Sequence, residues 1–213
     1  MTTTGPVVAA FDFDGTLTTR DTVVPFLLRL EGRLDLVLRL AARPLALCGA
    51  ALRRDRDRFK ALAVHAAFAG RSPELVGPLG AEYAAEVHGT LMRPDTLRRM
   101  AWHREQGHTI VLVSASLGAY LHTVGELLGV DAVLCTEAVV GPDGRYTGGM
   151  AGDNCRGPEK VRRLQAWLAD HQLTDAELWA YGDSKGDREL LASAAHPLMV
   201  KDVVVTAAPA DAR

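Results

Sequence analysis

Two carboxylates separated by one residue follow the first apolar run of the chain. Asp12 and Asp14 come directly after Val7–Phe11, and a Gly–Thr pair follows them at once. Continuous apolar residues with a turn signal behind them predict a buried strand. Two acids at the end of such a strand are costly unless a partner such as a cation compensates their charge. This stretch is therefore the first candidate for a chemical site.

Other polar side chains occupy related positions further along the chain. Ser114 follows the apolar run Thr109–Val113, and Asp183 comes just after the run Leu178–Tyr181. Lys160 lies in the first turn of a predicted helix, where the helix macrodipole disfavours a cation. A lysine in that position indicates that its ammonium faces an anionic group.

Together these groups suit phosphoryl transfer. A carboxylate that attacks phosphorus forms an acyl-phosphate and so divides one difficult step into two. A second acid protonates the leaving oxygen and later removes a proton from water. Mg²⁺ held by oxygen ligands neutralises charge on the nucleophile and the phosphate, while a hydroxyl and an ammonium hold the remaining phosphoryl oxygens.

The elements around these residues alternate between strands and helices, which predicts an α/β protein. The opening run has continuous apolar residues, as expected of a central parallel strand that is covered on both faces. Further strands are predicted at 109–113, 132–135, 178–181 and 197–200, a hairpin at 138–147, and helices beginning at Pro94, Leu117, Pro158 and Asp187. The alternation implies a Rossmann-like, doubly wound parallel sheet with right-handed crossovers, whose strand ends bring the polar residues to one rim.

Residues 21–89 break this alternation, because they contain helical patterns and no convincing strand. Asp21 or Thr22 is placed to cap the first of these helices. An all-helical insertion in a βα pattern predicts a small cap domain over residues 21–89, with the core formed by residues 1–20 and 90–213.

Composition narrows the function classes. The chain has 213 residues, of which 48% are hydrophobic and 23% charged, values that are ordinary for a globular protein. A net charge of −2 argues against a broad nucleic-acid-binding surface. The three cysteines form no CxxC pair, which predicts reduced thiols in a cytoplasmic protein. We expect neither a signal peptide nor a transmembrane segment.

In this arrangement the sequence resembles the haloacid dehalogenase superfamily of phosphohydrolases. Its four motifs are matched in order by Asp12-Phe13-Asp14-Gly15-Thr16, Val111-Leu112-Val113-Ser114, Pro158-Glu159-Lys160-Val161 and Gly182-Asp183-Ser184-Lys185-Gly186-Asp187. The helical insertion after the first motif and the form of the fourth motif are similar to the phosphoserine-phosphatase-like branch, subfamily IB. The resemblance covers nearly the whole chain outside the cap.

This resemblance implies a role for each matched residue. Asp12 would be the nucleophile and Asp14 the general acid/base. Mg²⁺ would be held by Asp12, the main-chain carbonyl of Asp14, and Asp183. The phosphoryl oxygens would be bound by Ser114, Lys160 and main-chain N–H groups around Phe13, Asp14 and Ala115. Supporting roles would fall to Asp187, which would hold waters of the metal or Lys160, and to Gly182 and Thr16.

The residues that would contact the rest of the substrate depart from those of phosphoserine phosphatases. Asp21 stands where those enzymes carry a Glu for the substrate amino group, and it serves equally well as a helix cap. The carboxylate-binding Arg of those enzymes has four candidate matches, which are Arg53, Arg54, Arg56 and Arg58. The second motif continues as Ser114-Ala115-Ser116 in place of the common Ser-Gly-Gly.

The cap leaves two interpretations open. Its leucine-rich stretches at 26–40 and 45–52, with arginines interspersed, form either the cap's own core or an amphipathic lid. Such a lid would accept an apolar chain or make weak contact with a membrane surface. The expected partner is therefore a small-molecule phosphate, either phosphoserine-like or of the lysophospholipid or glycerol type.

We thus expect a Mg²⁺-dependent phosphomonoester hydrolase that acts through an aspartyl-phosphate. A phosphomutase or phosphotransferase uses the same four motifs and is kept as an alternative. An inactive phosphate-binding module would be expected to lack Asp12 or Asp14, and both are present. A signalling receiver domain fits poorly, because its phosphoacceptor follows a middle strand and it has no helical cap. The sequence does not set the oligomeric state.

Overall fold

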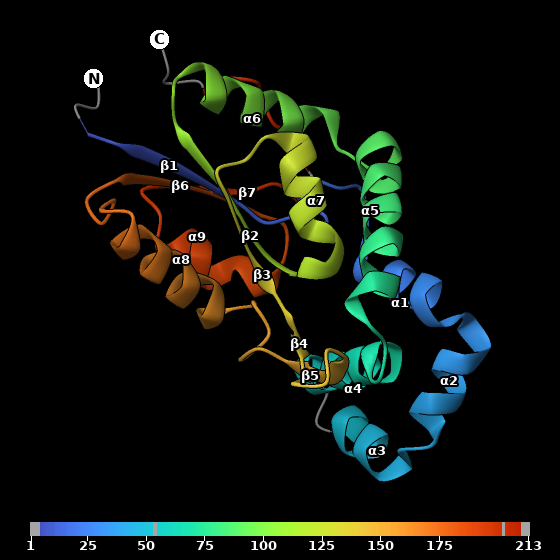
Figure 1. Cartoon of the computed structure of the whole chain (residues 1–213). Helices are drawn as coiled ribbons and strands as arrows, with labels where there is room; N and C mark the ends of the chain where they lie inside the picture. The colour runs from blue at the N-terminus through green and yellow to red at the C-terminus, as the bar shows by residue number, and fades with distance from the viewer. Residues whose placement is uncertain (1–4, 53–54, 202, 210–213) are drawn as a thin grey trace.

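The computed structural model describes residues 5–52, 55–201 and 203–209. In this part of the chain five parallel strands form one sheet in the order β3-β2-β1-β6-β7 (Figure 1). The strands are β1 Val7–Phe11, β2 Thr109–Leu117, β3 Ala132–Thr136, β6 Glu177–Gly182 and β7 His196–Met199. The expected doubly wound parallel sheet is confirmed, with the first strand at its centre.

The central strand β1 is buried on both faces. Ala9 and Phe11 belong to one hydrophobic core, whereas Val8 and Ala10 belong to a second core on the opposite face. Helices α6 and α7 cover the first face, and α8 and α9 cover the other (Figure 1). Their bounds are α6 Pro94–Glu105, α7 Gly118–Leu128, α8 Pro158–Asp170 and α9 Arg188–Ala192. Side chains alternate along a strand, so a continuous apolar run is what two covered faces require.

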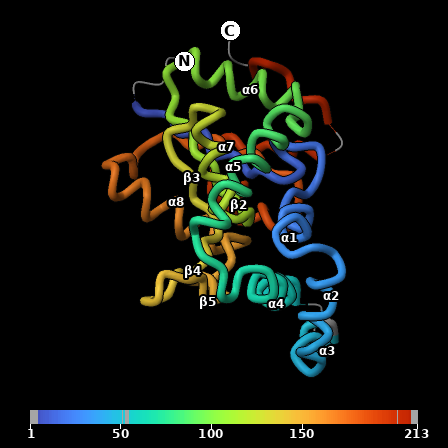
Figure 2. The backbone as a smooth tube through the Cα atoms, turned by 45° about the vertical axis from the view of Figure 1, so that its right-hand side comes forward, coloured from blue at the N-terminus to red at the C-terminus, as the bar shows by residue number. Residues whose placement is uncertain are grey.

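Five helices occupy the segment that the sequence predicted as a cap. They are α1 Val23–Glu31, α2 Arg33–Ala41, α3 Pro44–Leu52, α4 Arg56–Phe68 and α5 Pro73–Thr90, and no strand occurs among the described residues of 21–89. Figure 2 shows α3 at the end of this segment that is farthest from the sheet. The chain then returns through α5 to the base of α6 (Figure 1).

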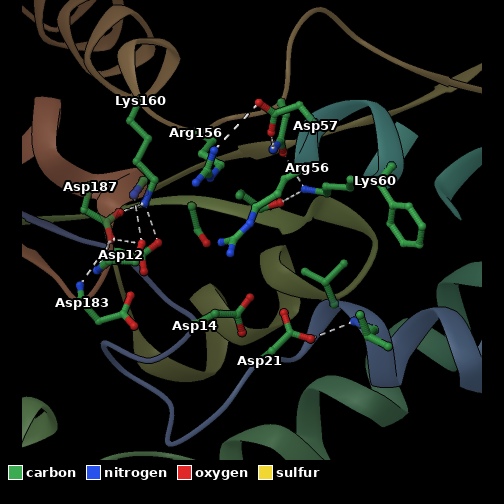
Figure 3. Close-up of a pocket in the computed structure, with 18 of the residues that line it drawn as sticks. Asp12, Asp14, Asp21, Arg56, Asp57, Lys60, Arg156, Lys160, Asp183 and Asp187 are labelled. Carbon is green, nitrogen blue, oxygen red and sulfur yellow. Dashed lines mark hydrogen bonds and ion pairs between the residues drawn. The ribbon is translucent and has the colours of Figure 1, made fainter. Parts of the chain in front are cut away.

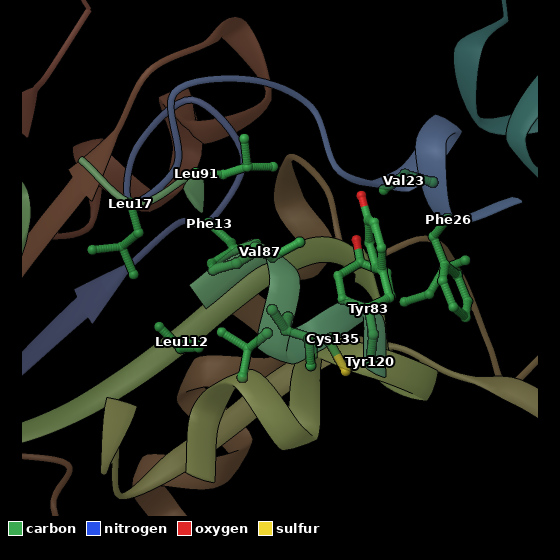
Figure 4. Close-up of a cluster of buried hydrophobic side chains, with 14 of the residues drawn as sticks. Phe13, Leu17, Val23, Phe26, Tyr83, Val87, Leu91, Leu112, Tyr120 and Cys135 are labelled. Carbon is green, nitrogen blue, oxygen red and sulfur yellow. The ribbon is translucent and has the colours of Figure 1, made fainter. Parts of the chain in front are cut away.

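The last cap helix, α5, packs closely along α7 of the core. A Cβ atom placed on Gly80 would lie 1.9 Å from the carbonyl oxygen of Ala119, so only glycine permits this approach. The rings of Tyr83 and Tyr120 meet edge to face, with centroids 5.3 Å apart. Both tyrosines belong to the large core cluster that also contains Phe13 (Figure 4). The cap helices and the sheet are therefore joined by shared apolar packing.

The predicted hairpin forms as β4 Ala138–Val140 and β5 Tyr146–Met150, which pair antiparallel. Its second strand contacts the end of the cap helix α4. The ring of Phe68 meets that of Tyr146 edge to face at 5.1 Å, and the Gly70 N–H donates to the Tyr146 carbonyl at 2.8 Å. The hairpin thus extends from the core to the cap.

Two predicted boundaries need correction. Strand β2 continues to Leu117 and does not end at Val113, although its regular pairing with β3 stops at Val113, where the register shifts. Such an irregularity re-aims side chains at the end of a strand. The helix expected from Asp187 is preceded by a 3₁₀ turn over Lys185–Asp187, because Ser184 and Asp187 cap each other there.

Among the described residues, no helix combines the length and the apolar character that crossing a bilayer requires.

Candidate active site

The carboxyl ends of β1, β2 and β6 meet at one edge of the sheet, where they surround a cavity of about 380 Å³. Asp12, Ser114 and Asp183 all line this cavity, as the expected shared rim requires. Figure 3 shows Lys160 and Asp187 at one end of the cavity and Lys60, from the cap, at the other. The cavity therefore lies between the sheet edge and the cap.

Lys160 and Asp12 form a buried ion pair at the core end of the cavity. The Lys160 ammonium donates to Asp12 Oδ1 and to Asp187 Oδ1, both at 2.5 Å. Burial disfavours the charged ammonium, but the two carboxylates outweigh that effect and raise the pKa of Lys160. Burial raises the pKa of Asp12, and the charge of Lys160 acts in the opposite direction. The lysine thus holds two carboxylates in place, as its position in the first turn of α8 indicated.

Asp12, Asp183 and Asp187 also form a group that fits a divalent cation. One carboxylate oxygen from each lies within 4.8 Å of the others. Burial and then the charges of Asp12 and Asp187 raise the pKa of Asp183 to about 6. Carboxylates crowded in this way are stabilised by a cation, and an all-oxygen donor set suits Mg²⁺. Gly15 contributes to the site, since at its φ of 78° a Cβ atom would lie 2.3 Å from Asp183 Oδ2.

Asp14 has an environment separate from that of Asp12. One of its oxygens, Oδ2, accepts from Ser116 Oγ at 2.6 Å, and the other accepts from the Thr22 N–H at 2.8 Å and the Thr22 hydroxyl at 2.6 Å. Burial raises the pKa of Asp14 to about 7, although these hydrogen bonds favour the charged form. The two carboxylates of the first motif therefore have different partners, since Asp12 pairs with the Lys160 ammonium and Asp14 accepts from hydroxyl and main-chain groups. The Asp14 carboxyl faces Ser116 and Thr22, and the metal ligand predicted at this residue is its main-chain carbonyl.

Of the remaining predicted residues, Ser114 and Asp21 line the cavity, whereas Thr16 and Gly182 lie beside residues that line it. Ser114 is buried and its Oγ accepts from the Ser116 N–H at 3.1 Å, while the Thr16 hydroxyl donates to Asp12 Oδ2 at 3.3 Å. A Cβ atom on Gly182 would lie 2.4 Å from the Cβ of Asp187. Asp21 lines the cavity, and Oδ2 of the same side chain accepts from the Val24 N–H at 3.0 Å at the start of α1. The helix-cap interpretation of Asp21 is confirmed by this hydrogen bond, and its contact with a substrate stays a prediction.

A set of contacts between cap and core was not predicted from the sequence. Lys60 of α4 donates to Asn154 Oδ1 at 2.6 Å and to the carbonyl of Ala115. Burial lowers the pKa of Lys60 to about 8. Asp57, one turn earlier, accepts from Asn154 Nδ2 at 2.7 Å and lies 4.0 Å from the Arg156 guanidinium. This network connects α4 directly to the residue that follows Ser114.

The side of the cavity formed by the cap combines guanidinium groups with an apolar wall. Arg56 lines the cavity, whereas Arg53 and Arg54 lie outside the described residues. Arg156, from the loop before α8, is a second guanidinium there. The apolar part consists of Val23, Val24, Leu27, Phe59 and Ala63. The sequence pattern alone did not distinguish Arg56 from the other candidate arginines, because all four lie in one charged run.

Comparison with known proteins connects this geometry to a family. A model of the haloacid dehalogenase-like hydrolase family matches residues 9–192. The chain is 36% identical to protein CicA of Caulobacter vibrioides over 192 residues, which cover 89% of this chain and 83% of that protein. It is 29% identical over 132 residues to a histidinol-phosphatase of Neisseria meningitidis, covering 61% of this chain and 60% of that protein.

A solved structure supports the same fold. The structure is described as a phospho-aspartyl intermediate analogue of phosphoserine phosphatase, and it matches with a TM-score of 0.60 and 18% sequence identity. The match covers 89% of this chain and 84% of that one. At this level of identity the likeness establishes the fold of the chain.

Proposed function

The chain belongs to the haloacid dehalogenase-like hydrolase family, and on that premise we propose that it is a Mg²⁺-dependent phosphatase that forms an aspartyl-phosphate on Asp12. One observation carries this proposal: the two carboxylates of the first motif have different partners. Asp12 is ion-paired to Lys160, whereas Asp14 accepts hydrogen bonds from the neutral residues Thr22 and Ser116 and burial raises its pKa to about 7. A nucleophile must be ionised, which the charge of Lys160 favours, and a general acid must carry a proton, which the raised pKa of Asp14 favours.

In the first step, an oxygen of Asp12 attacks phosphorus and the bond from phosphorus to the ester oxygen breaks. Asp14 gives its proton to that leaving oxygen, which departs as an alcohol. Lys160 and the Thr16 hydroxyl fix the Asp12 carboxylate during this attack. Ser114 and the main-chain N–H groups after it are proposed to bind the non-bridging phosphoryl oxygens.

In the second step, Asp14 takes a proton from water, whose oxygen attacks phosphorus and releases inorganic phosphate. Asp12 returns to its ionised form and Asp14 is again protonated. Asp12, Asp183 and the Asp14 carbonyl are the proposed ligands of Mg²⁺, with Asp187 beside them. When bound, the ion would neutralise negative charge, so that a carboxylate and a phosphate dianion can approach each other.

The proposed substrate is a small organic phosphomonoester, and we assign residues 21–89 as the cap that selects it. Two observations support different leaving groups. Asp21 offers a carboxylate to an ammonium group, as in a phosphoserine-like substrate, and Arg56 offers a guanidinium to a carboxylate. The apolar wall that contains Leu27 and Phe59 fits the acyl chain of a lysophospholipid or the carbons of a glycerol-type phosphate.

Return of the phosphate to a second hydroxyl, in a phosphomutase or phosphotransferase, would use the same residues of the core.

The three cysteines Cys48, Cys135 and Cys155 are free thiols, which supports a reducing compartment, and we propose the cytoplasm.

A panel of phosphomonoesters, assayed for inorganic phosphate with and without Mg²⁺, tests the proposal. The panel should include phosphoserine, histidinol phosphate, glycerol phosphate and lysophosphatidate. We expect release of phosphate from at least one of them that EDTA abolishes and added Mg²⁺ restores. Turnover that is unchanged by EDTA would contradict the role of the metal, and isomerised ester without phosphate release would favour the mutase.

A further inference from the structure

Two cap helices expose large apolar side chains along one face each. On α2 the exposed residues are Leu34, Val37 and Leu38, of which Leu34 retains 70% of its accessible surface. On α3 they are Leu45 and Leu52, at 90% and 86% exposure. Residues spaced by three, four or seven positions lie on the same side of a helix. We call these five residues the hairpin surface.

The opposite faces of the same helices are covered. Leu36 of α2 and Ala50 of α3 are buried, and both helices pack against α4. The hairpin surface therefore points away from α4. Figure 2 shows α3, which carries two of its residues, at the end of the cap that is farthest from the sheet. Within the described part of the chain nothing covers these side chains, and large exposed apolar residues on two neighbouring helices are characteristic of an interaction site.

The charge around this surface identifies the kind of partner. Between Arg33 and Leu52, the segment that carries this surface, the sequence has three basic residues and one acidic residue, a formal charge of +2 in a chain whose net charge is −2. No acidic residue occurs between Leu36 and Arg54. The side chains of Arg33 and Arg43, which flank the apolar faces, are exposed. A face-to-face contact between two copies would bring these positive charges together, whereas an anionic surface would neutralise them.

We propose that the hairpin surface docks on an anionic lipid bilayer, with the leucines inserted at the level of the headgroups and the arginines on lipid phosphates. Amphipathic helices with aliphatic residues on one face and arginines beside them bind in this way, and the acidic leaflet attracts the basic residues. Helix α4, against which α2 and α3 pack, also supplies Arg56, Phe59 and Lys60 to the cavity. Docking would therefore place the cap side of the cavity near the membrane surface.

Vesicle binding tests this proposal without turnover, so its failure is distinct from failure of the proposed phosphatase activity. The full chain is sedimented with vesicles of phosphatidylcholine alone and of phosphatidylcholine mixed with phosphatidylglycerol. We expect binding to the mixed vesicles that weakens as salt is added, and little binding to the neutral ones. Equal binding to both, or no binding to either, would overturn the proposal.

Matched variants locate the surface. Leu45→Ser combined with Leu52→Ser should lower the partition coefficient by more than about tenfold, because two leucines no longer enter the interface. Leu75→Ser combined with Leu127→Ser is the control, since both of these leucines are 48% exposed on other helices. An equal loss in the two double variants would contradict the assignment.

Light scattering of the same proteins tests the alternative that a second copy of the chain covers the hairpin surface. If the wild-type chain is a dimer, and the Leu45→Ser and Leu52→Ser variant is a monomer of equal thermal stability, the surface is an interface between copies and the membrane proposal is wrong. An unchanged oligomeric state together with lost vesicle binding would support it.

Discussion

The ammonium of Lys160 lies 2.5 Å from Asp12 Oδ1, although 148 positions separate the two residues in the sequence. Lys160 retains only 2% of its accessible surface, so the pair is removed from water. It joins the first turn of α8 to the end of β1, across the edge of the sheet where the other polar residues meet. Because a cation is disfavoured at a helix N-terminus, the pairing with two carboxylates explains why lysine is found there.

Loss of this lysine should destabilise the protein. Lys160→Met leaves the buried Asp12 and Asp187 without their cation, and removal of one partner from a buried ion pair typically costs about 3 kcal/mol or more. We expect urea denaturation in EDTA to show a fall of that size in the free energy of unfolding. Lys185→Met is the control, since Lys185 is exposed and lies in the same 3₁₀ turn as Asp187. Equal effects of the two substitutions would show that the buried pair does not stabilise the fold.

Replacement of Asp14 should depend on the leaving group. Asp14→Asn cannot donate a proton, so turnover of alkyl phosphates should fall by about a hundredfold or more, the usual contribution of general acid catalysis. Turnover of p-nitrophenyl phosphate should fall much less in the first step, because its phenolate leaves without protonation. Steady-state rates on both substrates, with wild-type protein as reference, measure the difference. Equal losses of turnover on both substrates would mean that Asp14 serves only to bind the metal.

The contact of Lys60 with the Ala115 carbonyl should matter for every substrate. Lys60→Met removes the donor that connects α4 to Ala115 of β2, the residue after Ser114, so we expect kcat/KM to fall by about tenfold or more for phosphoserine and p-nitrophenyl phosphate alike. Arg58→Met, at an exposed position of the same helix, serves as the control. A loss confined to one substrate would instead mean that Lys60 contacts the leaving group.

Acid should destabilise the protein through His103. Burial, and then the charges of His108, Arg99 and His196, lower its pKa to about 3. Its Nε2 lies 2.7 Å from the Tyr181 hydroxyl. A pKa depressed in the folded state means that the stabilisation is present above pH 6.5 and is lost as the pH falls from 6.5 towards 3.

At pH 5 that loss should reach up to about 2 kcal/mol relative to pH 7.5. In His103→Gln the dependence of the free energy of unfolding on pH should be shallower by this amount. His88→Gln, at an exposed position on α5, should keep the wild-type dependence. An identical pH dependence in all three proteins would contradict the role of His103.

Much of the core could be predicted from the sequence because its signals are local. A continuous apolar run such as Val7–Phe11 is typical of a central parallel strand, and an acid, hydroxyl or lysine at an element end is visible without any tertiary contact. The rim then follows from topology, since parallel strands place their carboxyl ends at one edge. Ser116 had a signal as well, because it lies two residues after Ser114 and so faces the same side of an extended strand.

The contribution of the cap could not be predicted in the same way. Lys60 and Asp57 lie in a charged stretch whose sequence is typical of a solvent-exposed helix face. Asn154 lies in a loop whose sequence has no recognisable pattern. Their contacts depend on how the cap is placed over the core, which no local spacing encodes. The same holds for the leucines: Leu27 and Leu36 are buried as cap core, whereas Leu34, Leu45 and Leu52 are exposed. The cap-core interpretation is therefore confirmed for the buried leucines, and the lid interpretation stays a prediction for the exposed ones.

The covalent intermediate is the most direct test of the proposed site residues of the core. The wild-type chain is incubated with Mg²⁺ and a substrate identified by the panel, quenched in acid during turnover and treated with borohydride, which reduces an acyl-phosphate to an alcohol. Peptide mass spectrometry then locates the reduced side chain. We predict homoserine at position 12 in the wild-type chain, and none in Asp12→Asn, whose turnover should fall by several orders of magnitude. Full turnover with an unmodified Asp12, or homoserine at another aspartate, would contradict the proposed mechanism.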